Sequence, residues 1–281
     1  MLLRFLSAGV ILPAFLWLLF CYPLGFRVFI LVALLLGYEE YRRLMAYKGL
    51  RFSPWLGLLA LLMVLTPPTL GVDHIPAALA PLLQRSGSLG LAAFFVAAAL
   101  WRVAKADLEQ GLLRFFAELG GLVYLGLLGL HLLKLNALPY GSWWCLLVFW
   151  YAWVYDSAAL FAGKGFGKTP FSPLSPKKTW EGFWGGVVCS ALVSALILPH
   201  WIPPELGLSA WGYAALSIPA SVLAQAGDLF ESMVKRFSGK KDSSGLIPAQ
   251  GGFLDKMDSS LFVAPLIYFA ATTLADLHWL P

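Results

Sequence analysis

The stretch from Ser142 to Ala162, SWWCLLVFWYAWVYDSAALFA, contains one charged residue, Asp156. A helix needs roughly 20 apolar residues to cross the hydrocarbon core of a bilayer, and this stretch is long enough to do so. Comparable apolar runs recur on both sides of it. We predict nine transmembrane helices, at residues 4–21, 25–38, 54–68, 88–103, 117–134, 142–162, 183–199, 209–227 and 259–277.

The composition of the whole chain is that of a membrane protein. Of its 281 residues, 59% are hydrophobic and 12% are charged, whereas a soluble domain carries about 25% charged residues. Too few charges are present to cover a globular surface in water. We therefore predict an all-α, polytopic integral membrane protein that forms a single membrane domain over residues 1–281 and has the lipid bilayer as its surroundings.

The basic residues predict the orientation of the chain. With three exceptions, the lysines and arginines lie near the N-terminus or in or beside four connections, at residues 39–53, 104–116, 163–182 and 228–258. The exceptions are Arg27, Arg85 and Lys134. Cytoplasmic connections are enriched in Lys and Arg, so we expect a cytoplasmic N-terminus and a multi-pass protein of the bacterial inner (cytoplasmic) membrane. Because this orientation accounts for the net charge of +5, we expect no nucleic-acid partner.

The two largest polar stretches lie in the second half of the chain. We therefore divide it into an N-terminal transmembrane region, 1–140, and a C-terminal catalytic transmembrane region, 141–281. The two largest polar connections of the C-terminal region, 163–182 and 228–258, are predicted to carry the chemistry. In the N-terminal region, Pro76–Leu83 is a weaker apolar piece that predicts a short turn of helix.

Three carboxylates stand close to predicted membrane helices. Asp228 follows one apolar run, while Asp255 and Asp258 precede the next. A charge in the bilayer core costs at least about 2.5–3.5 kcal/mol, so these groups need water, a lysine or a cation beside them. Asp255 and Asp258 share a helix face, as do Asp228 and Ser232, and such oxygens suit Mg²⁺. The alternative is that Asp258 caps its helix and Asp255 favours the positive helix end.

The connection between these carboxylates is strongly basic. Its cations are Lys235, Arg236, Lys240 and Lys241, and its later part contains the pair Gly251–Gly252. Basic side chains and glycine amides are suited to phosphate groups. The alternative is an anchor on anionic lipid, although an anchor alone would not need the neighbouring carboxylates.

The connection 163–182 repeats the same chemistry. Glycines alternate with Lys164 and Lys168, and Lys177 and Lys178 follow. The last two could hold a lipid phosphate at the membrane surface, whereas Thr179 or Ser175 could simply begin the next helix. Asp156, inside the preceding span, is a candidate functional residue for which Lys164 or Lys168 is the expected partner.

Several of these residues fall in one pattern. The chain reads S-x-x-K-R over 232–236, K-D at 241–242, and I-P-A-Q-G-G-F-L-D-K-M-D over 247–258. In sequence and spacing this resembles the signature of the phosphatidate cytidylyltransferase (CDP-diacylglycerol synthase) family, and the resemblance extends over roughly 150–260. Two positions depart from it. Gln250 replaces a usual His and cannot act as an acid or base, and Lys256 replaces a usual Arg and loses its bidentate fork.

The resemblance implies a Mg²⁺-dependent nucleotidyltransferase of phospholipid biosynthesis. Its partners would be CTP and phosphatidic acid, its products CDP-diacylglycerol and pyrophosphate, with a second cation and a homodimer left open. In the implied site, Asp228 and Asp255 bind the metal, and Asp258 and Asp242 support it. The residues expected to contact the substrates are Ser232, Lys235, Arg236 and Lys241 for the nucleotide phosphates, Lys177 and Lys178 for the lipid head group, and Lys164, Lys168, Gly251, Gly252 and Lys256 around them.

Three other functions are alternatives to this one. A CDP-alcohol phosphotransferase also handles lipid nucleotides at a membrane, but its D-G-x-x-A-R start is absent from the chain. A CTP-dependent lipid kinase would use the same substrate classes but release CDP in place of pyrophosphate. A membrane transporter would be favoured by Asp156 within a span, although the sequence shows no paired halves of the inverted-repeat kind.

Overall fold

A computed structural model describes residues 2–70, 80–106, 109–246 and 251–278. Every predicted span falls on a helix of this structure, so the helix positions are confirmed. Within the described residues, four helices are both long and apolar enough to cross a membrane: Gly111–Asn136, Gly141–Phe166, Trp180–Trp201 and Leu254–Leu274. The chain is therefore a helical membrane protein with several spans. The predicted turn at Pro76–Leu83 lies partly outside the described residues, and its last residues belong to a longer helix.

The chain forms two compact units. The first unit comprises Met1–Ala137 and Val234–Lys256, and the second comprises Leu138–Met233 and Met257–Pro281. The end of one long helix and the start of the next thus belong to the first unit. The division into regions 1–140 and 141–281 stays a prediction.

The first unit is built almost entirely from helices. Its elements are α1 (Leu2–Cys21), α2 (Pro23–Ala46), α3 (Pro54–Leu70), α4 (Ala80–Lys105), α5 (Gly111–Gly121), the π-helix η2 (Leu122–Leu127) and α6 (Leu128–Asn136). Helix α2 packs against α3, α5 and α6. Small residues allow this approach, since Gly121 meets the Tyr41 ring and Gly129 meets Leu34. The Tyr41 hydroxyl donates a hydrogen bond to the Ala117 carbonyl at 2.9 Å, which fixes α2 on α5.

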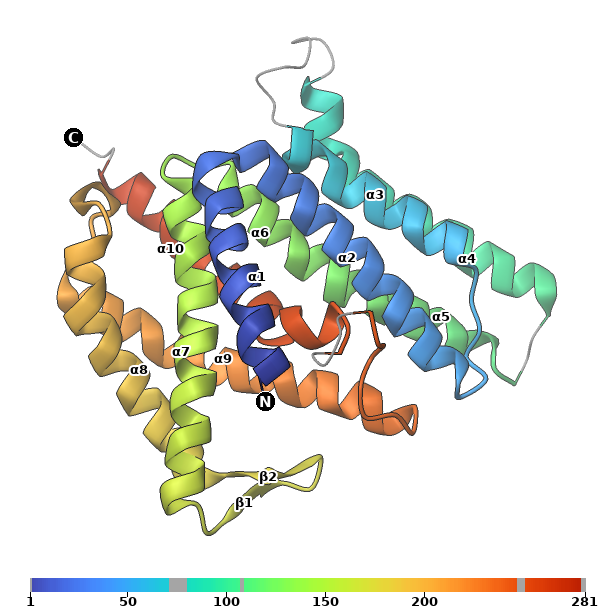
Figure 1. The fold of residues 1–281 in the computed structure, drawn as a ribbon. Helices are drawn as coiled ribbons and strands as arrows, with labels where there is room; N and C mark the ends of the chain where they lie inside the picture. Colours follow the sequence, from blue (N-terminus) through green and yellow to red (C-terminus); the bar gives the residue numbers. More distant parts are fainter. Residues whose placement is uncertain (1, 71–79, 107–108, 247–250, 279–281) are drawn as a thin grey trace. The chain divides into compact units, whose positions relative to one another are not determined.

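The second unit contains four long helices and a small hairpin. Its elements are α7 (Gly141–Phe166), β1 (Pro170–Ser172), β2 (Ser175–Thr179), α8 (Trp180–Trp201), the short η3 (Pro204–Leu206), α9 (Ala210–Phe237) and α10 (Leu254–His278). Helices α7 and α8 lie side by side (Figure 1). Gly186 packs on the Tyr155 ring, and the Trp150 indole donates to the Ser194 hydroxyl at 3.0 Å. Close packing of this kind holds helices together in lipid.

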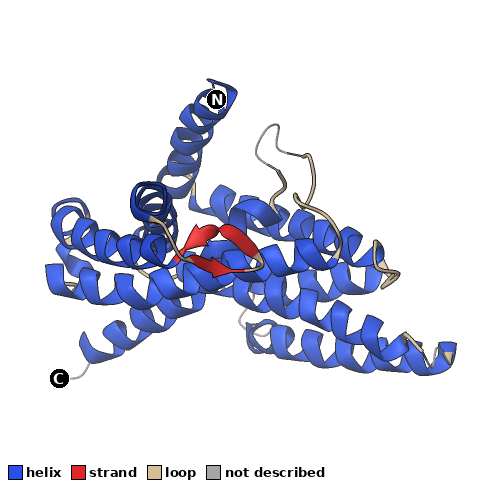
Figure 2. Ribbon diagram, turned by 90° about the horizontal axis from the view of Figure 1, so that it is seen from below, coloured by secondary structure: helices blue, strands red, loops and turns tan. Residues whose placement is uncertain are grey.

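The connection 163–182 contains a β-hairpin between the end of α7 and the start of α8, which the all-α prediction did not include (Figure 2). Strands β1 and β2 pair antiparallel, with Pro170 opposite Thr179 and Ser172 opposite Ser175. Thr179 also caps α8, because its hydroxyl accepts a hydrogen bond from the Gly182 amide at 3.1 Å. The capping alternative for Thr179 is thereby confirmed. The hairpin gives the lysines of β2 a fixed backbone.

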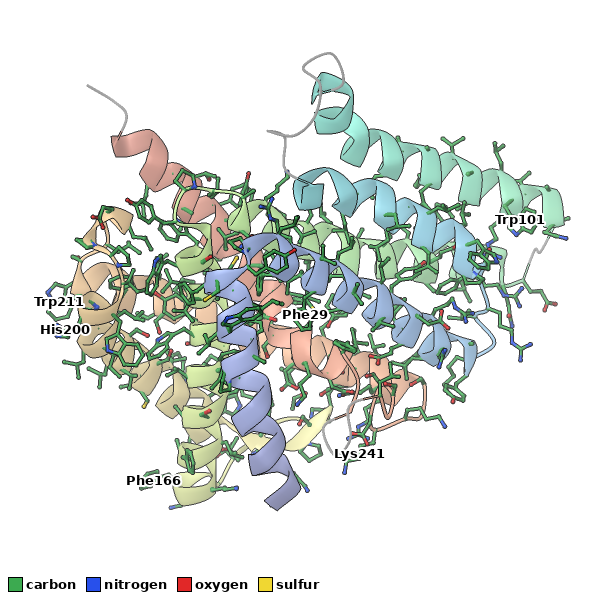
Figure 3. All side chains as sticks on the ribbon, turned by 45° about the horizontal axis from the view of Figure 1, so that its top comes forward. Phe29, Trp101, Phe166, His200, Trp211 and Lys241 are labelled. Atoms are coloured by element: carbon green, nitrogen blue, oxygen red, sulfur yellow. The ribbon has the colours of Figure 1, made fainter. Side chains whose placement is uncertain are left out.

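Large apolar side chains are exposed on the helices, as Figure 3 shows for several labelled residues. Trp211 is 83% exposed and Phe166 is 75% exposed. A soluble protein rarely exposes so much apolar surface, whereas lipid tails cover such side chains in a membrane. This surface agrees with the membrane assignment from composition.

Candidate functional site

Three carboxylates gather in the second unit. Asp228 and Glu231 lie on α9 and Asp258 lies on α10, with one oxygen of each within 4.8 Å of the others. Glu231 is 1% exposed, and the two aspartates are half-buried. Three negative charges at this spacing repel one another unless cations lie among them. We call Asp228, Glu231 and Asp258 the acidic cluster.

Close contact between α9 and α10 forms the acidic cluster. A side chain at Gly227 would collide with the backbone carbonyl oxygen of Asp258. One turn further along, the Phe230 and Phe262 rings pack with centroids 5.7 Å apart. Gly227 therefore lets the helix carrying Asp228 approach the helix carrying Asp258.

Replacing Gly227 with Ala should separate α9 from α10. Overpacking at such a contact typically costs about 1–3 kcal/mol, so we expect a lower melting temperature of the detergent-solubilised protein. Gly165→Ala is the matched control, because a Cβ there meets nothing within 4 Å. Equal melting temperatures of the two variants would show that the α9–α10 contact does not limit stability.

Lys178 reaches the acidic cluster from the hairpin. Its ammonium group forms an ion pair with the Asp228 carboxylate and donates to the Gln225 side-chain oxygen at 3.2 Å. The Tyr155 hydroxyl donates to the same oxygen at 2.7 Å. Gln225 is buried, so this bond from α7 orients it. The structure thus brings Lys178 and Asp228 together, a pairing that the sequence did not predict.

Asp156 lies on α7, close to the residue that follows Asp258 of the acidic cluster. Its carboxylate accepts a hydrogen bond from the Ser259 hydroxyl, at 3.5 Å, and Ser259 follows Asp258 in α10. Within the described residues, neither Lys164 nor Lys168 forms an ion pair with Asp156. Both lysines are exposed. Lys164 lies about two helical turns from Asp156 and Lys168 follows the end of α7, so the expected partnership is wrong.

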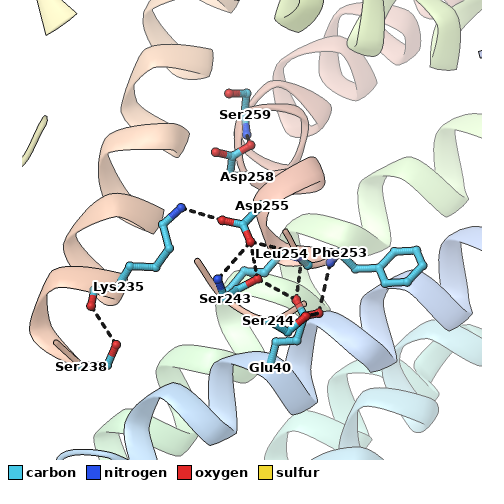
Figure 4. A network of polar contacts seen from close by, with 11 residues as sticks. Glu40, Lys235, Ser238, Ser243, Ser244, Phe253, Leu254, Asp255, Asp258 and Ser259 are labelled. Atoms are coloured by element: carbon cyan, nitrogen blue, oxygen red, sulfur yellow. Dashed lines mark hydrogen bonds and ion pairs between the residues drawn. The ribbon is translucent and has the colours of Figure 1, made fainter. Parts of the chain in front are cut away.

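Asp255 occupies a different setting, in the first unit (Figure 4). One carboxylate oxygen forms an ion pair with Lys235 at 2.7 Å. The other accepts hydrogen bonds from the Ser243 amide at 3.0 Å, the Ser243 hydroxyl at 2.5 Å and the Gly252 amide at 2.8 Å. Asp255 therefore ties the end of α9 and the following connection to the start of α10. Its sharing of one ion with Asp228 stays a prediction.

Most of the other predicted side chains are exposed. Ser232 is half-buried on α9, and the exposed ones are Lys164, Lys168, Lys177, Arg236, Lys241, Asp242 and Lys256. Lys241 is labelled at the surface in Figure 3. Gly251 has a φ of 89°, a left-handed conformation that glycine adopts readily. Gln250 lies outside the described residues.

Two carboxylates of the structure, Glu231 and Glu40, were not among the predicted residues. Glu231 lies three residues after Asp228 on the same helix, so helical spacing could have placed both on one face. Glu40 follows a predicted span on α2 and contacts the connection between α9 and α10. Nothing in the local sequence around Glu40 indicates contact with residues some 200 positions away.

Fold and site together define a helical membrane protein whose carboxylates and lysines suit phosphorylated ligands. Residues 2–274 match the model of the Cytidylyltransferase family, and the chain belongs to that family. The match extends over both units. It confirms the resemblance drawn from residues 232–258 and extends it into the N-terminal half.

Individual relatives agree with the family match. A Brucella suis protein named phosphatidate cytidylyltransferase is 30% identical over 97% of this chain and 94% of its own length. A Haemophilus influenzae protein of the same name is 42% identical over 51% of each chain. One from Aquifex aeolicus is 39% identical over 55% of this chain and 56% of its own. The two more identical matches thus span about half the length of those relatives.

Proposed function

We propose that this protein is a phosphatidate cytidylyltransferase, which converts CTP and phosphatidic acid to CDP-diacylglycerol and pyrophosphate. The observation that supports this proposal most directly is the acidic cluster with Lys178 ion-paired to Asp228, in a chain of the Cytidylyltransferase family. A reaction between two phosphate anions needs positive charge at the point of attack. Carboxylates that can hold a cation, beside a lysine that can meet a phosphate, supply that need.

The donor set of the acidic cluster fits Mg²⁺. Carboxylate oxygens are the hard ligands that this ion prefers, usually together with water and substrate phosphates, and Asp228, Glu231 and Asp258 offer three such groups within 4.8 Å. When bound, Mg²⁺ would neutralise charge on the nucleotide phosphates and favour departure of pyrophosphate. Asp228 is the central ligand in this proposal. Asp255 is a second proposed ligand of Mg²⁺, and the proposal allows for a second cation.

The chemical step needs little more than positioning. An oxygen of the lipid phosphate forms a bond to the α-phosphorus of CTP, and the bond between that phosphorus and the oxygen bridging to the β-phosphorus breaks. The bond electrons leave with pyrophosphate. Because the lipid phosphate is already ionised, no strong general base is required, and Gln250 in place of His is compatible with activity. Holding both reactants in line contributes much of the rate.

The basic residues divide between the two substrates. Lys178, beside Asp228, and its neighbour Lys177 bind the head group of phosphatidic acid. Lys235, Arg236 and Lys241 bind the triphosphate, with Ser232 hydrogen-bonded to a phosphate. Supporting positions around the substrates are held by Asp242, Lys164, Lys168, Gly251, Gly252 and Lys256.

The proposed topology has nine spans and a cytoplasmic N-terminus in the bacterial inner membrane. Both polar connections then face the cytoplasm, where CTP is available, and both border the leaflet that holds phosphatidic acid. The positive-inside distribution of lysines and arginines supports this orientation. A homodimer is compatible with the proposal and plays no part in the chemistry.

Product analysis tests the function. Purified protein in detergent, given phosphatidic acid, CTP labelled at the α-phosphate and Mg²⁺, should form labelled lipid and pyrophosphate in equal amounts. Chelation by EDTA should abolish both products, and added Mg²⁺ should restore them. A CTP-dependent lipid kinase would release labelled CDP and leave the lipid unlabelled, which would refute the proposal. A transporter would form no product.

A further inference from the structure

Glu40 is a buried carboxylate that the proposed chemistry does not use. It lies on α2, is 2% exposed and faces four donors, three from the connection between α9 and α10 and one from Leu254, the first residue of α10. The donors are the Ser243 hydroxyl at 3.0 Å, the Ser244 hydroxyl at 2.6 Å, the Phe253 amide at 3.2 Å and the Leu254 amide at 2.9 Å. One side chain of the N-terminal half thus holds both described parts of this connection.

Glu40 is joined to Asp255 through Ser243 (Figure 4). The Ser243 hydroxyl lies 3.0 Å from a Glu40 oxygen and 2.5 Å from an Asp255 oxygen. It has one proton to donate, and the shorter distance assigns that proton to Asp255. Asp255 in turn forms its ion pair with Lys235 at the end of α9. A continuous series of contacts within the first unit therefore runs from α2 to a lysine assigned to the nucleotide phosphates.

The backbone beside Glu40 is adapted to this contact. A side chain at position 252 would collide with the Glu40 carboxylate and the Ser243 hydroxyl, so any residue other than glycine would displace one of these groups. The Phe253 and Leu254 amides stand at the beginning of α10, where backbone N–H groups lack partners within the helix. A carboxylate is favoured at this positive end. Its burial is compensated because several donors converge on it.

We propose that Glu40 is a positioning residue for nucleotide binding. It fixes the connection between α9 and α10 so that Asp255 holds Lys235 in the orientation that meets the CTP triphosphate. This inference rests on the proposed function, and it adds a determinant of CTP affinity from the N-terminal half. Glu40 itself touches neither substrate.

Glu40→Gln tests the proposal with little change in size. The amide group keeps one oxygen acceptor but places an NH₂ toward donors, and it removes the negative charge. We expect the KM for CTP and the Kd for CTP measured by calorimetry to rise roughly 10–100-fold, the range seen when residues that orient binding groups are lost. The KM for phosphatidic acid should change less than about twofold, because Glu40 is bonded only to the connection assigned to the nucleotide.

Glu39→Gln is the matched control on the same helix. Glu39 forms ion pairs with Arg42 at 2.6 Å and Arg43 at 2.8 Å, and the hydrogen bond from Arg42 lowers the pKa of its carboxyl below the usual value. It has no place in the series from Glu40 to Lys235, so its CTP affinity should equal that of the wild type. Ser244→Ala, which removes one of the four donors, should raise the KM for CTP by a smaller factor than Glu40→Gln. It also provides a test if Glu40→Gln does not fold.

The outcomes separate the two proposals. Wild-type protein that forms no CDP-diacylglycerol would refute the proposed function. An active wild type, with unchanged KM and Kd for CTP in Glu40→Gln and Ser244→Ala, would overturn the positioning role. A fall in melting temperature without a change in CTP affinity would show that Glu40 only stabilises the start of α10. An equal rise in KM for both substrates would also overturn the role.

Discussion

Asp228→Asn is expected to reduce kcat for CDP-diacylglycerol formation by at least about 10²-fold, the loss typical when one preorganised electrostatic group is removed from an active site. The substitution preserves shape but removes a charge from the acidic cluster and breaks the ion pair between Asp228 and Lys178. Both the proposed Mg²⁺ site and the orientation of Lys178 are affected. The measurement is the rate of labelled lipid formation at saturating CTP and Mg²⁺.

Glu205→Gln is the control for loss of one carboxylate in the same unit. Glu205 is exposed on the short helix η3, away from the acidic cluster in sequence, and its substitution should leave kcat unchanged. Wild-type kcat in Asp228→Asn, with normal expression in the membrane, would remove the proposed site. The Mg²⁺ concentration that gives half-maximal activity distinguishes the acidic cluster from a ligand set of Asp228 and Asp255. Glu231→Gln should raise this concentration only if the acidic cluster binds the ion.

Lys178→Met is expected to lower kcat/KM for phosphatidic acid by about 10–100-fold. A hydrogen bond to a charged group contributes about 1.5–3 kcal/mol, and Lys178 stands between Asp228 and Gln225. Methionine preserves much of the stem but provides no cation for the lipid phosphate. It also removes one positive charge from beside the acidic cluster. Initial rates at varied phosphatidic acid in mixed micelles provide the measurement.

Lys177→Met is the comparison for Lys178→Met. Lys177 is adjacent in β2 but exposed, so its contribution to head-group binding should be smaller, at less than about tenfold, as for other exposed charges. Equal losses in the two variants would indicate that the lysines act only as general surface charge. A larger loss in Lys177→Met would contradict the assignment of Lys178 as the principal head-group ligand.

The sequence determined where the helices lie. Each apolar run became a helix because hydropathy and backbone hydrogen bonding in a bilayer are local requirements that a short segment meets by itself. Asp228, Asp255 and Asp258 could also be selected locally, since a charge beside an apolar run is costly without a partner. The spacing of residues 232–258 predicted the family, which residues 2–274 confirm.

Only the tertiary structure decided which polar groups meet. Lys178 pairs with Asp228 across 50 positions of sequence because the hairpin directs β2 toward α9. Glu231 joins the acidic cluster because Gly227 allows α9 to approach Asp258, and Glu40 reaches Ser243 and Leu254 from α2. These contacts depend on helix packing and on a hairpin register, which arise between segments distant in sequence. The identity of a single residue therefore does not reveal which residue it contacts.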